Sequence, residues 1–223
     1  MPIFNTEYKS YWEFKPWANT LAYYKFDWNL NDSSTNWHNL SLYTGSAAYW
    51  TASWWWTYVH FNQNTWANYW TLSWFNYDWN HTISLWLNPQ TNFGTSWNNC
   101  LFELRESSSY AFVRFCANVA VSYWFSPAFT QALSVWIWYN MIYTRSWNSA
   151  KMYINWTLVN SWTAPITWRT NQTIRFRLNQ IGDTNSSSYA NNAYYSDVIF
   201  ESKEWSAQEV SDYYNLTKSN YGL

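Results

Sequence analysis

Glycine and charged residues are both scarce in this sequence. It contains 4 glycines in 223 residues, whereas ordinary usage of about 7% would give roughly 15. Charged residues make up 11% of the chain, and the net charge is −1. This balance excludes, as default functions, a basic nucleic-acid-binding surface and electrostatic attachment to a membrane. Membrane insertion is not expected either, because no apolar run approaches the roughly 20 residues that a transmembrane helix needs.

The N-terminal segment, MPIFNTEYKSYWEF, lacks a basic stretch followed by an apolar one. No secretory signal peptide is therefore visible, and an export signal would have to lie upstream in a longer parent chain. A length of 223 residues fits one domain. We assign residues 1–17 to an N-terminal extension and residues 18–223 to a single domain.

Tryptophan, by contrast, is abundant, with 22 residues, and many of them stand in turn contexts. In residues 150–159, two β-type runs flank the pair Asn155-Trp156. A two-residue hairpin turn of type I′ requires φ > 0 at both central residues, for which Asn-Gly is the strongest signal. Trp adopts φ > 0 only with strain. Nine tryptophans directly follow Asp, Asn or Ser: Trp28, Trp37, Trp54, Trp74, Trp79, Trp97, Trp147, Trp156 and Trp162.

We therefore hypothesise that most tryptophans stand where the natural protein has glycine. This pattern would arise if UGA codons that the source organism reads as glycine were translated as Trp. Exchanging about nineteen residues would bring glycine to a value common in turn-rich β proteins. Trp86, Trp138 and Trp205 are the exceptions, because they lie in strand or helix-entry contexts where an indole can pack. The alternative is a native Trp-rich surface, as in a sugar-binding or interfacial protein.

The remaining pattern is rich in β-type segments. Many short strands separated by turns, with no long helix, predict an all-β antiparallel sandwich. Ser206-Ala-Gln-Glu209 reads as a capping box before an apolar stripe at helical spacing, so a short helix should close the chain. Twelve runs are predicted as strands: 21–26, 39–43, 58–61, 81–87, 100–105, 111–116, 119–125, 138–144, 151–154, 157–160, 173–178 and 194–202.

Several segments occur in an order that is specific when taken together. They are residues 18–34 with their Asp27-Trp28-Asn29 turn, 81–89, 138–159, 181–200 and 204–210. Read with glycine at the turns, the chain from Ala18 to Leu216 resembles the bacterial laminin-G-like, concanavalin A-like lectin/glucanase family. The resemblance implies a jelly-roll sandwich of two curved antiparallel sheets. This scaffold hosts lectins, hydrolases and structural modules, so the resemblance does not by itself supply a function.

A calcium site is the best candidate for metal binding. Asp27 and Asp32, with Asn29 nearby, offer oxygen ligands in a loop, which is what calcium prefers. The family tends to place its last strand beside its first, so the resemblance implies that Asp197 would join them. A structural Ca²⁺ would then hold the two ends of the domain together. Alternatively, Asp27 and Asp32 are ordinary turn formers, and Asp197 pairs with a nearby polar group.

A ligand site is expected at the Ser/Asn-rich loop that precedes the last strand. Sugar binding needs exposed aromatic rings, which stack on sugar faces, and amides, which bind hydroxyls. The candidates are Tyr189, Asn191, Asn192 and Tyr194. Loops at the rim of a rigid scaffold commonly carry binding residues. The alternative is a tolerant surface loop without a ligand.

Cys100 and Cys116 are the only cysteines and lie equally far from Ser108 in a predicted hairpin. They would face each other across the two strands, within reach of a disulfide. A disulfide would favour an extracytoplasmic location. Two buried free thiols are equally consistent with the sequence.

No catalytic residues are assigned. Glycoside hydrolysis needs two carboxylates flanking the sugar, and the nearest match is Glu103 with Glu106. A spacing of three places these two on opposite faces of a strand. The sequence thus predicts a non-catalytic, lectin-like domain of an exported or surface protein that binds a glycan or a partner protein. The alternatives are a glycoside hydrolase or lyase of the same fold, or a structural spacer in a larger adhesin.

Overall fold

The computed structural model describes most of the strands and the C-terminal helix. The described residues are 16–40, 42–44, 47–53, 56–61, 66–67, 75, 79–91, 100–106, 111–117, 130–131, 133–163, 174–178 and 192–223.

In the described residues the larger of two sheets has eight strands, and all its pairings are antiparallel. Seven of them follow the order β12 (Thr157–Thr163), β11 (Ser149–Ile154), β10 (Tyr139–Ser146), β6 (His81–Pro89), β14 (Ala193–Glu201), β4 (Trp56–Phe61) and β3 (Ala47–Ser53). The eighth, β1 (Thr20–Tyr24), also pairs with β14. Thus β14 pairs with β4 through its first residues and with β1 through its last.

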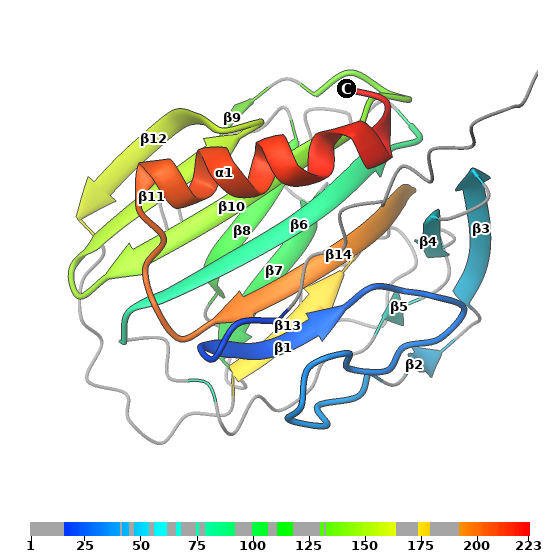
Figure 1. The fold of residues 1–223 in the computed structure, drawn as a ribbon, viewed down its shortest axis with the longest axis horizontal. Helices are drawn as coiled ribbons and strands as arrows, with labels where there is room; N and C mark the ends of the chain where they lie inside the picture. The colour runs from blue at the N-terminus through cyan, green and yellow to red at the C-terminus, as the bar shows by residue number, and fades with distance from the viewer. Residues whose placement is uncertain are drawn as a thin grey trace, which may run out of the picture.

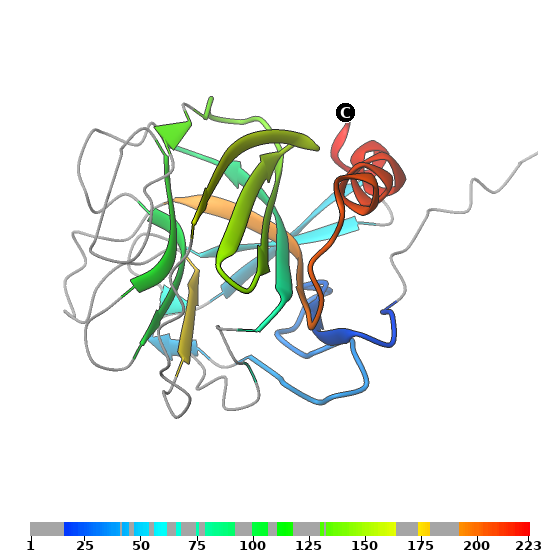
Figure 2. The same ribbon diagram turned by 90° about the vertical axis from the view of Figure 1, so that its left-hand side faces the viewer.

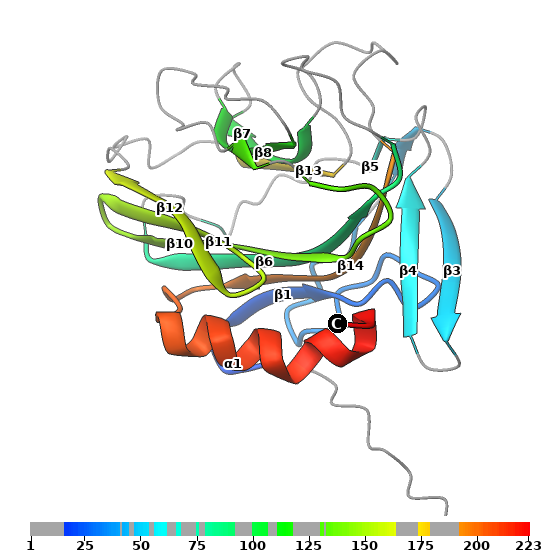
Figure 3. The same cartoon turned by 90° about the horizontal axis from the view of Figure 1, so that it is seen from above.

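The smaller sheet has six strands in the part of the chain that the structure describes. Their order is β2 (Leu42–Thr44), β5 (Trp66–Ala67), β13 (Ile174–Leu178), β7 (Cys100–Glu106), β8 (Ala111–Ala117) and β9 (Thr130–Gln131). The helix α1 (Ala207–Thr217) and the 3₁₀ turn η2 (Lys218–Tyr221) follow β14. The two sheets and the helix form three layers, with the larger sheet in the middle (Figures 1 and 3). Figure 2 shows the helix and the smaller sheet on opposite sides.

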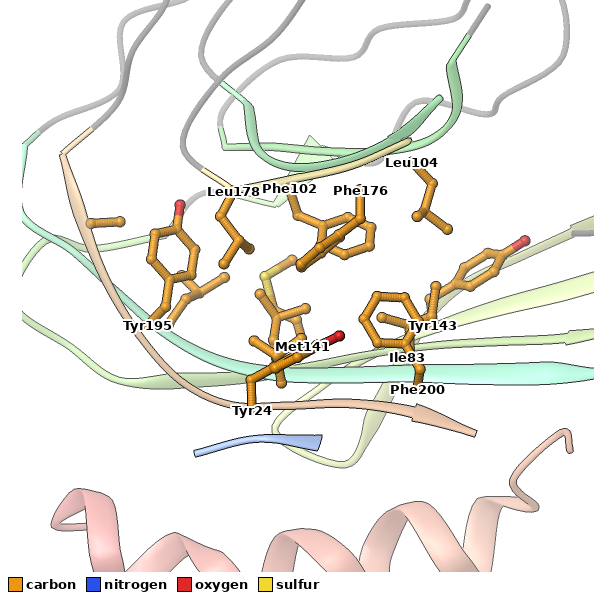
Figure 4. Close-up of a cluster of buried hydrophobic side chains, with 14 of the residues drawn as sticks. Tyr24, Ile83, Phe102, Leu104, Met141, Tyr143, Phe176, Leu178, Tyr195 and Phe200 are labelled. Atoms are coloured by element: carbon orange, nitrogen blue, oxygen red, sulfur yellow. The ribbon is translucent and has the colours of Figure 1, made fainter. Parts of the chain in front are cut away.

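The main core lies between the two sheets (Figure 4). Strand β6 contributes every second residue to it, through Ile83, Leu85 and Leu87, because successive side chains of a strand point to opposite faces. Phe102 of β7 and Phe176 of β13 meet them from the smaller sheet, with ring centroids 5.3 Å apart. All nine residues of β6 are buried, so its other face must be covered as well.

The helix α1 covers that second face. Trp205, just before the helix, is fully buried and packs with Val210 and Tyr213 against Ile142 of β10 and Ile199 of β14. The predicted capping box is present. Ser206 Oγ accepts a hydrogen bond from the Glu209 backbone N–H at 3.2 Å, and Glu209 Oε2 accepts one from the Ser206 N–H at 2.9 Å.

The all-β prediction is confirmed, and eleven of the twelve predicted runs overlap strands in the described residues. The twelfth, 119–125, lies outside them. The sequence reading missed β3, β5 and β9. Two of these have only two residues each, and β3, with the sequence AAYWTAS, lacks the apolar alternation that marks a strand.

Five of the described tryptophans have left-handed backbone conformations: Trp28, Trp37, Trp136, Trp147 and Trp156, with φ between 49° and 66°. The hairpin turn between β11 and β12 has φ of 47° at Asn155 and 66° at Trp156, so the predicted positive φ at both central residues is confirmed. The turn interpretation of Trp162 is wrong, because this residue lies within β12 and pairs with Ala150.

Two buried groups in the larger sheet have strongly shifted pKa values. Burial raises the pKa of Glu201 to about 7, partly offset by the hydrogen bond that Thr20 Oγ1 donates to it at 2.5 Å. Burial lowers the pKa of His81 to about 3. Between about pH 4.5 and 7 the unfolded chain loses the Glu201 proton while the folded protein keeps it. The stability of the folded protein therefore falls as the pH rises through this range. His81 has the opposite effect, because its unfolded form takes up a proton below its usual value of 6.5.

We expect Glu201→Gln, an isostere of the protonated acid, to gain stability relative to the parent as the pH rises through this window. The stability difference between variant and parent should grow by roughly 3 kcal/mol between about pH 4.5 and pH 8. Urea unfolding at both ends of the range measures it. A difference that does not change with pH would contradict the assignment.

Candidate functional site

A stack of aromatic rings lies where the C-terminal helical segment meets the end of β6. Trp86 of β6 is fully buried, and its ring stacks on Tyr221 with centroids 3.8 Å apart. Tyr214 of α1 stacks against the same indole at 5.9 Å. Gly222 then adopts a left-handed φ of 74° and caps η2. In Figure 1 the C-terminus, the end of β6, the start of β14 and β4 gather at the same end of the molecule.

Beside this stack lie four partly exposed rings, Tyr58, His60, Trp138 and Tyr194, which we call the aromatic patch. Trp138 contacts Tyr221 at 5.1 Å between centroids and Tyr58 at 5.7 Å. Tyr194 lies 4.6 Å from Tyr58 and 4.9 Å from His60.

The strand register explains why these rings meet. Tyr194 of β14 is the direct cross-strand partner of His60 of β4, and Tyr58 shares the face of His60 because strand side chains alternate. Val59 between them points to the other face and is buried in the main core. Cross-strand neighbours of this kind have their β-carbons about 5 Å apart, close enough for ring contact.

Three amide side chains adjoin the patch. Asn88 of β6 is the cross-strand partner of Tyr194. His60 Nε2 hydrogen-bonds Asn192 Oδ1, and the Gln90 backbone N–H donates to the Asn192 carbonyl at 2.8 Å. Gln90 Nε2 contacts the Asn88 side chain at 2.7 Å. With its amide turned by 180°, Asn88 instead accepts a hydrogen bond from Trp138 Nε1 at 3.3 Å and donates one to the Pro89 carbonyl at 3.1 Å.

The described side chains of the patch and its amides are all uncharged types, apart from the imidazole of His60. Burial raises the pKa of Tyr58, and the neighbouring Tyr194 adds to this effect. The Tyr58 phenol is therefore neutral at physiological pH and can both donate and accept a hydrogen bond.

The structure brings together two of the four predicted ligand residues, Asn192 and Tyr194. Tyr189 and Asn191 lie outside the described residues. The sequence reading did not include Tyr58 and His60, which come from a strand more than 130 residues away in the chain. Their signal was the alternation Tyr58-Val59-His60, which predicts one face with two ring-bearing residues but not which strand lies beside it.

The three predicted metal ligands make different hydrogen bonds, although the charge of Asp27 helps to raise the pKa of Asp197. Asp32 is buried and organises its own loop. Its Oδ1 accepts hydrogen bonds from the backbone N–H groups of Tyr23 at 2.9 Å and Ser34 at 2.8 Å, and its Oδ2 accepts one from that of His38 at 2.9 Å. Asp27 is exposed and accepts a hydrogen bond from Thr57 Oγ1 at 2.5 Å. The Asp32 arrangement, with a hydrogen bond from the backbone two residues on, is that of a turn-forming acid, whereas the Asp27 contact joins its loop to β4.

Asp197 lies at a bulge of β14, with φ of 47°, close to where the neighbour of β14 changes from β4 to β1. Its two carboxylate oxygens accept hydrogen bonds from the phenols of Tyr23 and Tyr221, each at 2.6 Å. Burial raises the pKa of Asp197, and these two hydrogen bonds lower it in part. The carboxylate thus links β1 to the C-terminal turn.

Among the described residues, no group of three His, Cys, Asp or Glu side chains is placed to hold a metal ion. Calcium binding by Asp27, Asp32 and Asp197 stays a prediction. Cys100 and Cys116 are direct cross-strand partners in β7 and β8, as the hairpin predicts. Their side chains, and those of Glu103 and Glu106 in β7, lie outside the part of the chain that the structure describes, so the disulfide also stays a prediction.

Neither a family model nor a curated protein sequence matches the chain. Solved structures do. Domain 4 of AbnA, a GH43 extracellular arabinanase from Geobacillus stearothermophilus, in complex with arabinotriose, aligns with a TM-score of 0.68 and 15% identity, covering 87% of this chain and 97% of that domain. Trypanosoma rangeli sialidase in complex with 2,3-difluoro-KDN aligns with a TM-score of 0.65 and 10% identity, covering 92% of this chain and 33% of the sialidase.

The binding domain of botulinum neurotoxin DC, in complex with rat synaptotagmin II, aligns with a TM-score of 0.57 and 13% identity. The match covers 88% of this chain and 51% of the toxin chain. The fold is a β-sandwich. At these identities the likenesses establish the fold alone, and the chain spans only a third to a half of the sialidase and toxin structures. No helix in the described part of the chain has the length and apolar character that a membrane crossing needs.

We expect Asp197→Asn to destabilise the protein by at least about 2 kcal/mol, because two buried phenols lose a charged acceptor. The matched control Asp27→Asn, at an exposed position, should change stability by less than about 1 kcal/mol. Thermal unfolding in EDTA gives both values. Equal losses in the two variants would contradict the structural role of Asp197. Repeating the experiment in millimolar CaCl₂ tests the calcium prediction, under which the parent gains in Tm and both variants gain less.

Proposed function

We propose that this chain is a non-catalytic, lectin-like module that binds a glycan through the aromatic patch. The observation that carries the proposal is the combination of partly exposed rings, Tyr58, Trp138 and Tyr194, with adjoining amides on one face of the larger sheet. Aromatic faces offer apolar contact at low conformational cost, and amides offer both donors and acceptors to hydroxyls. Binding sites commonly combine such apolar surface with a few polar groups that fix orientation.

The comparisons support a binding role without deciding its partner. The arabinanase domain, which matches nearly over its full length, is in complex with arabinotriose. The toxin binding domain is in complex with a protein, synaptotagmin II, so a protein partner is the second candidate. An extracellular or cell-surface location fits either partner. A hydrolase of the same fold would require two carboxylates flanking a sugar, and the aromatic patch includes none.

We expect Tyr194→Ala to weaken oligosaccharide binding by at least roughly tenfold, because it removes a ring at the centre of the patch. The control is Leu158→Ala, which removes an exposed apolar side chain from β12 at the far edge of the same sheet. Isothermal titration with arabinotriose and galactotriose measures the affinities. If Leu158→Ala weakens binding as much as Tyr194→Ala, or if the parent binds neither these two sugars nor an acidic oligosaccharide, the patch is not a glycan site.

We further infer that the tryptophans with left-handed backbone are glycines in the natural protein. Among the described residues, five tryptophans have positive φ, and the side chains of all five are exposed, from 54% at Trp156 to 82% at Trp37. By contrast, Trp86 and Trp205 are fully buried. An L-residue with a side chain loses roughly 1–2 kcal/mol in the left-handed region, whereas glycine does not. Sequencing the source DNA tests this inference: TGA codons at these five positions would support it, and TGG at all five would refute it.

The same inference predicts that Trp156→Gly stabilises the protein by about 1 kcal/mol, because it relieves strain in the β11–β12 turn. The matched control is Trp50→Gly in β3. Trp50 is similarly exposed, at 52%, but its backbone does not have a positive φ. Glycine should therefore destabilise that strand by about 1 kcal/mol, because it relieves no strain and loses more conformational freedom on folding. Urea unfolding of both variants measures the difference. A loss of stability in Trp156→Gly would contradict the inference.

A further inference from the structure

We propose that the aromatic patch selects uncharged oligosaccharides over anionic ones, such as those containing uronic or sialic acids. This proposal rests on the proposed function and adds to it the chemical class of the ligand. It follows from the kinds of polar group that line the patch and from the composition of the chain segments that adjoin it.

The polar groups of the patch that can meet a ligand are phenols and amides. Tyr58 and Tyr194 each offer a hydroxyl, and Asn192 offers an amide. His60 is already hydrogen-bonded through Nε2 to Asn192. Lys218, a cation of the adjoining 3₁₀ turn, lies over the Tyr214 ring at 5.5 Å and donates a hydrogen bond to Asn215 Oδ1 at 2.9 Å.

The segments that continue from the patch strands carry almost no charge in the sequence. Residues 90–99 follow β6 and residues 132–138 lead into β10, and neither stretch contains Lys, Arg, Asp or Glu; residues 62–80, between β4 and β6, contain one charged residue, the anion Asp78. Residues 179–191, before β14, contain one charged residue, the anion Asp183. These adjoining segments therefore supply no Lys or Arg that could pair with an anionic ligand, whatever path they take.

Physical chemistry then separates the two ligand classes. A sugar hydroxyl exchanges water for phenol and amide groups, each of which both donates and accepts. A carboxylate that is partly desolvated at the patch loses hydration without gaining a cationic partner, and this loss is unfavourable. Arg is the residue that proteins use most effectively for carboxylates, and none is among the four patch residues and their three amides.

The test compares galactotriose with galacturonotriose, which share the same rings and differ by a carboxylate at C6 of each sugar. We expect the parent protein to bind the neutral trisaccharide at least tenfold more tightly in isothermal titration near pH 7.5. Added NaCl should not change the neutral affinity, because no charge pair contributes. Lactose and 3′-sialyllactose, which adds one sialic acid residue to lactose, form a second pair. His60→Arg should narrow the gap by adding a cation, whereas the size-matched control Leu158→Arg, on the far edge strand, should not.

Equal or tighter binding of the anionic member, lost in Tyr194→Ala, would overturn the selectivity and leave the glycan site in place. Binding of either member that Tyr194→Ala does not weaken would overturn the glycan site itself. If the parent protein binds none of these four sugars and does not bind arabinotriose either, both proposals are overturned. A tenfold preference that Tyr194→Ala abolishes and His60→Arg reduces would support both.

Discussion

The larger sheet depends on having both of its faces covered. Strand β6 at its centre is buried at every position, with Ile83, Leu85 and Leu87 on one face and Trp86 on the other. The smaller sheet covers the first face, and the C-terminal helix covers the second (Figure 3). A sheet of this kind cannot be stable with one face exposed, because apolar side chains would then remain in water. The helix is therefore part of the fold rather than an appendage.

The aromatic patch follows from this arrangement. Trp205 packs just before helix α1, and the 3₁₀ turn η2 that follows the helix ends at Tyr221, whose ring stacks on Trp86. Asp197 fixes that end by accepting a hydrogen bond from the Tyr221 phenol while another from Tyr23 holds β1. Beside Tyr221, where the C-terminal helical segment ends, the aromatic rings on this face of the larger sheet are partly exposed rather than buried. The same carboxylate that fastens the termini thus helps define the border of the candidate site.

Turn geometry imposes a second constraint on the chain. Hairpins of two residues match the right-handed twist of their strands only with left-handed residues at the turn. Trp156 lies in such a hairpin, and among the described residues four other tryptophans also have a left-handed backbone, although the region is sterically unfavourable for any side chain. The backbone thus carries strain where a glycine would carry none. Exposed indoles at these turns are consequently poor evidence for a binding surface, whereas Trp138, packed on Tyr58 and Tyr221, belongs to the site.

The sequence by itself determined the local features: the β-rich pattern, the helix start at Ser206 and the positive φ at Asn155-Trp156. These depend on neighbouring residues only, so periodicity, capping and turn chemistry suffice to predict them. It also placed Asn192 and Tyr194 in a candidate site. Only the tertiary structure decided that His60 lies beside them, from a strand more than 130 residues away. Strand order and register are set by burial over the whole sheet, which no single segment encodes.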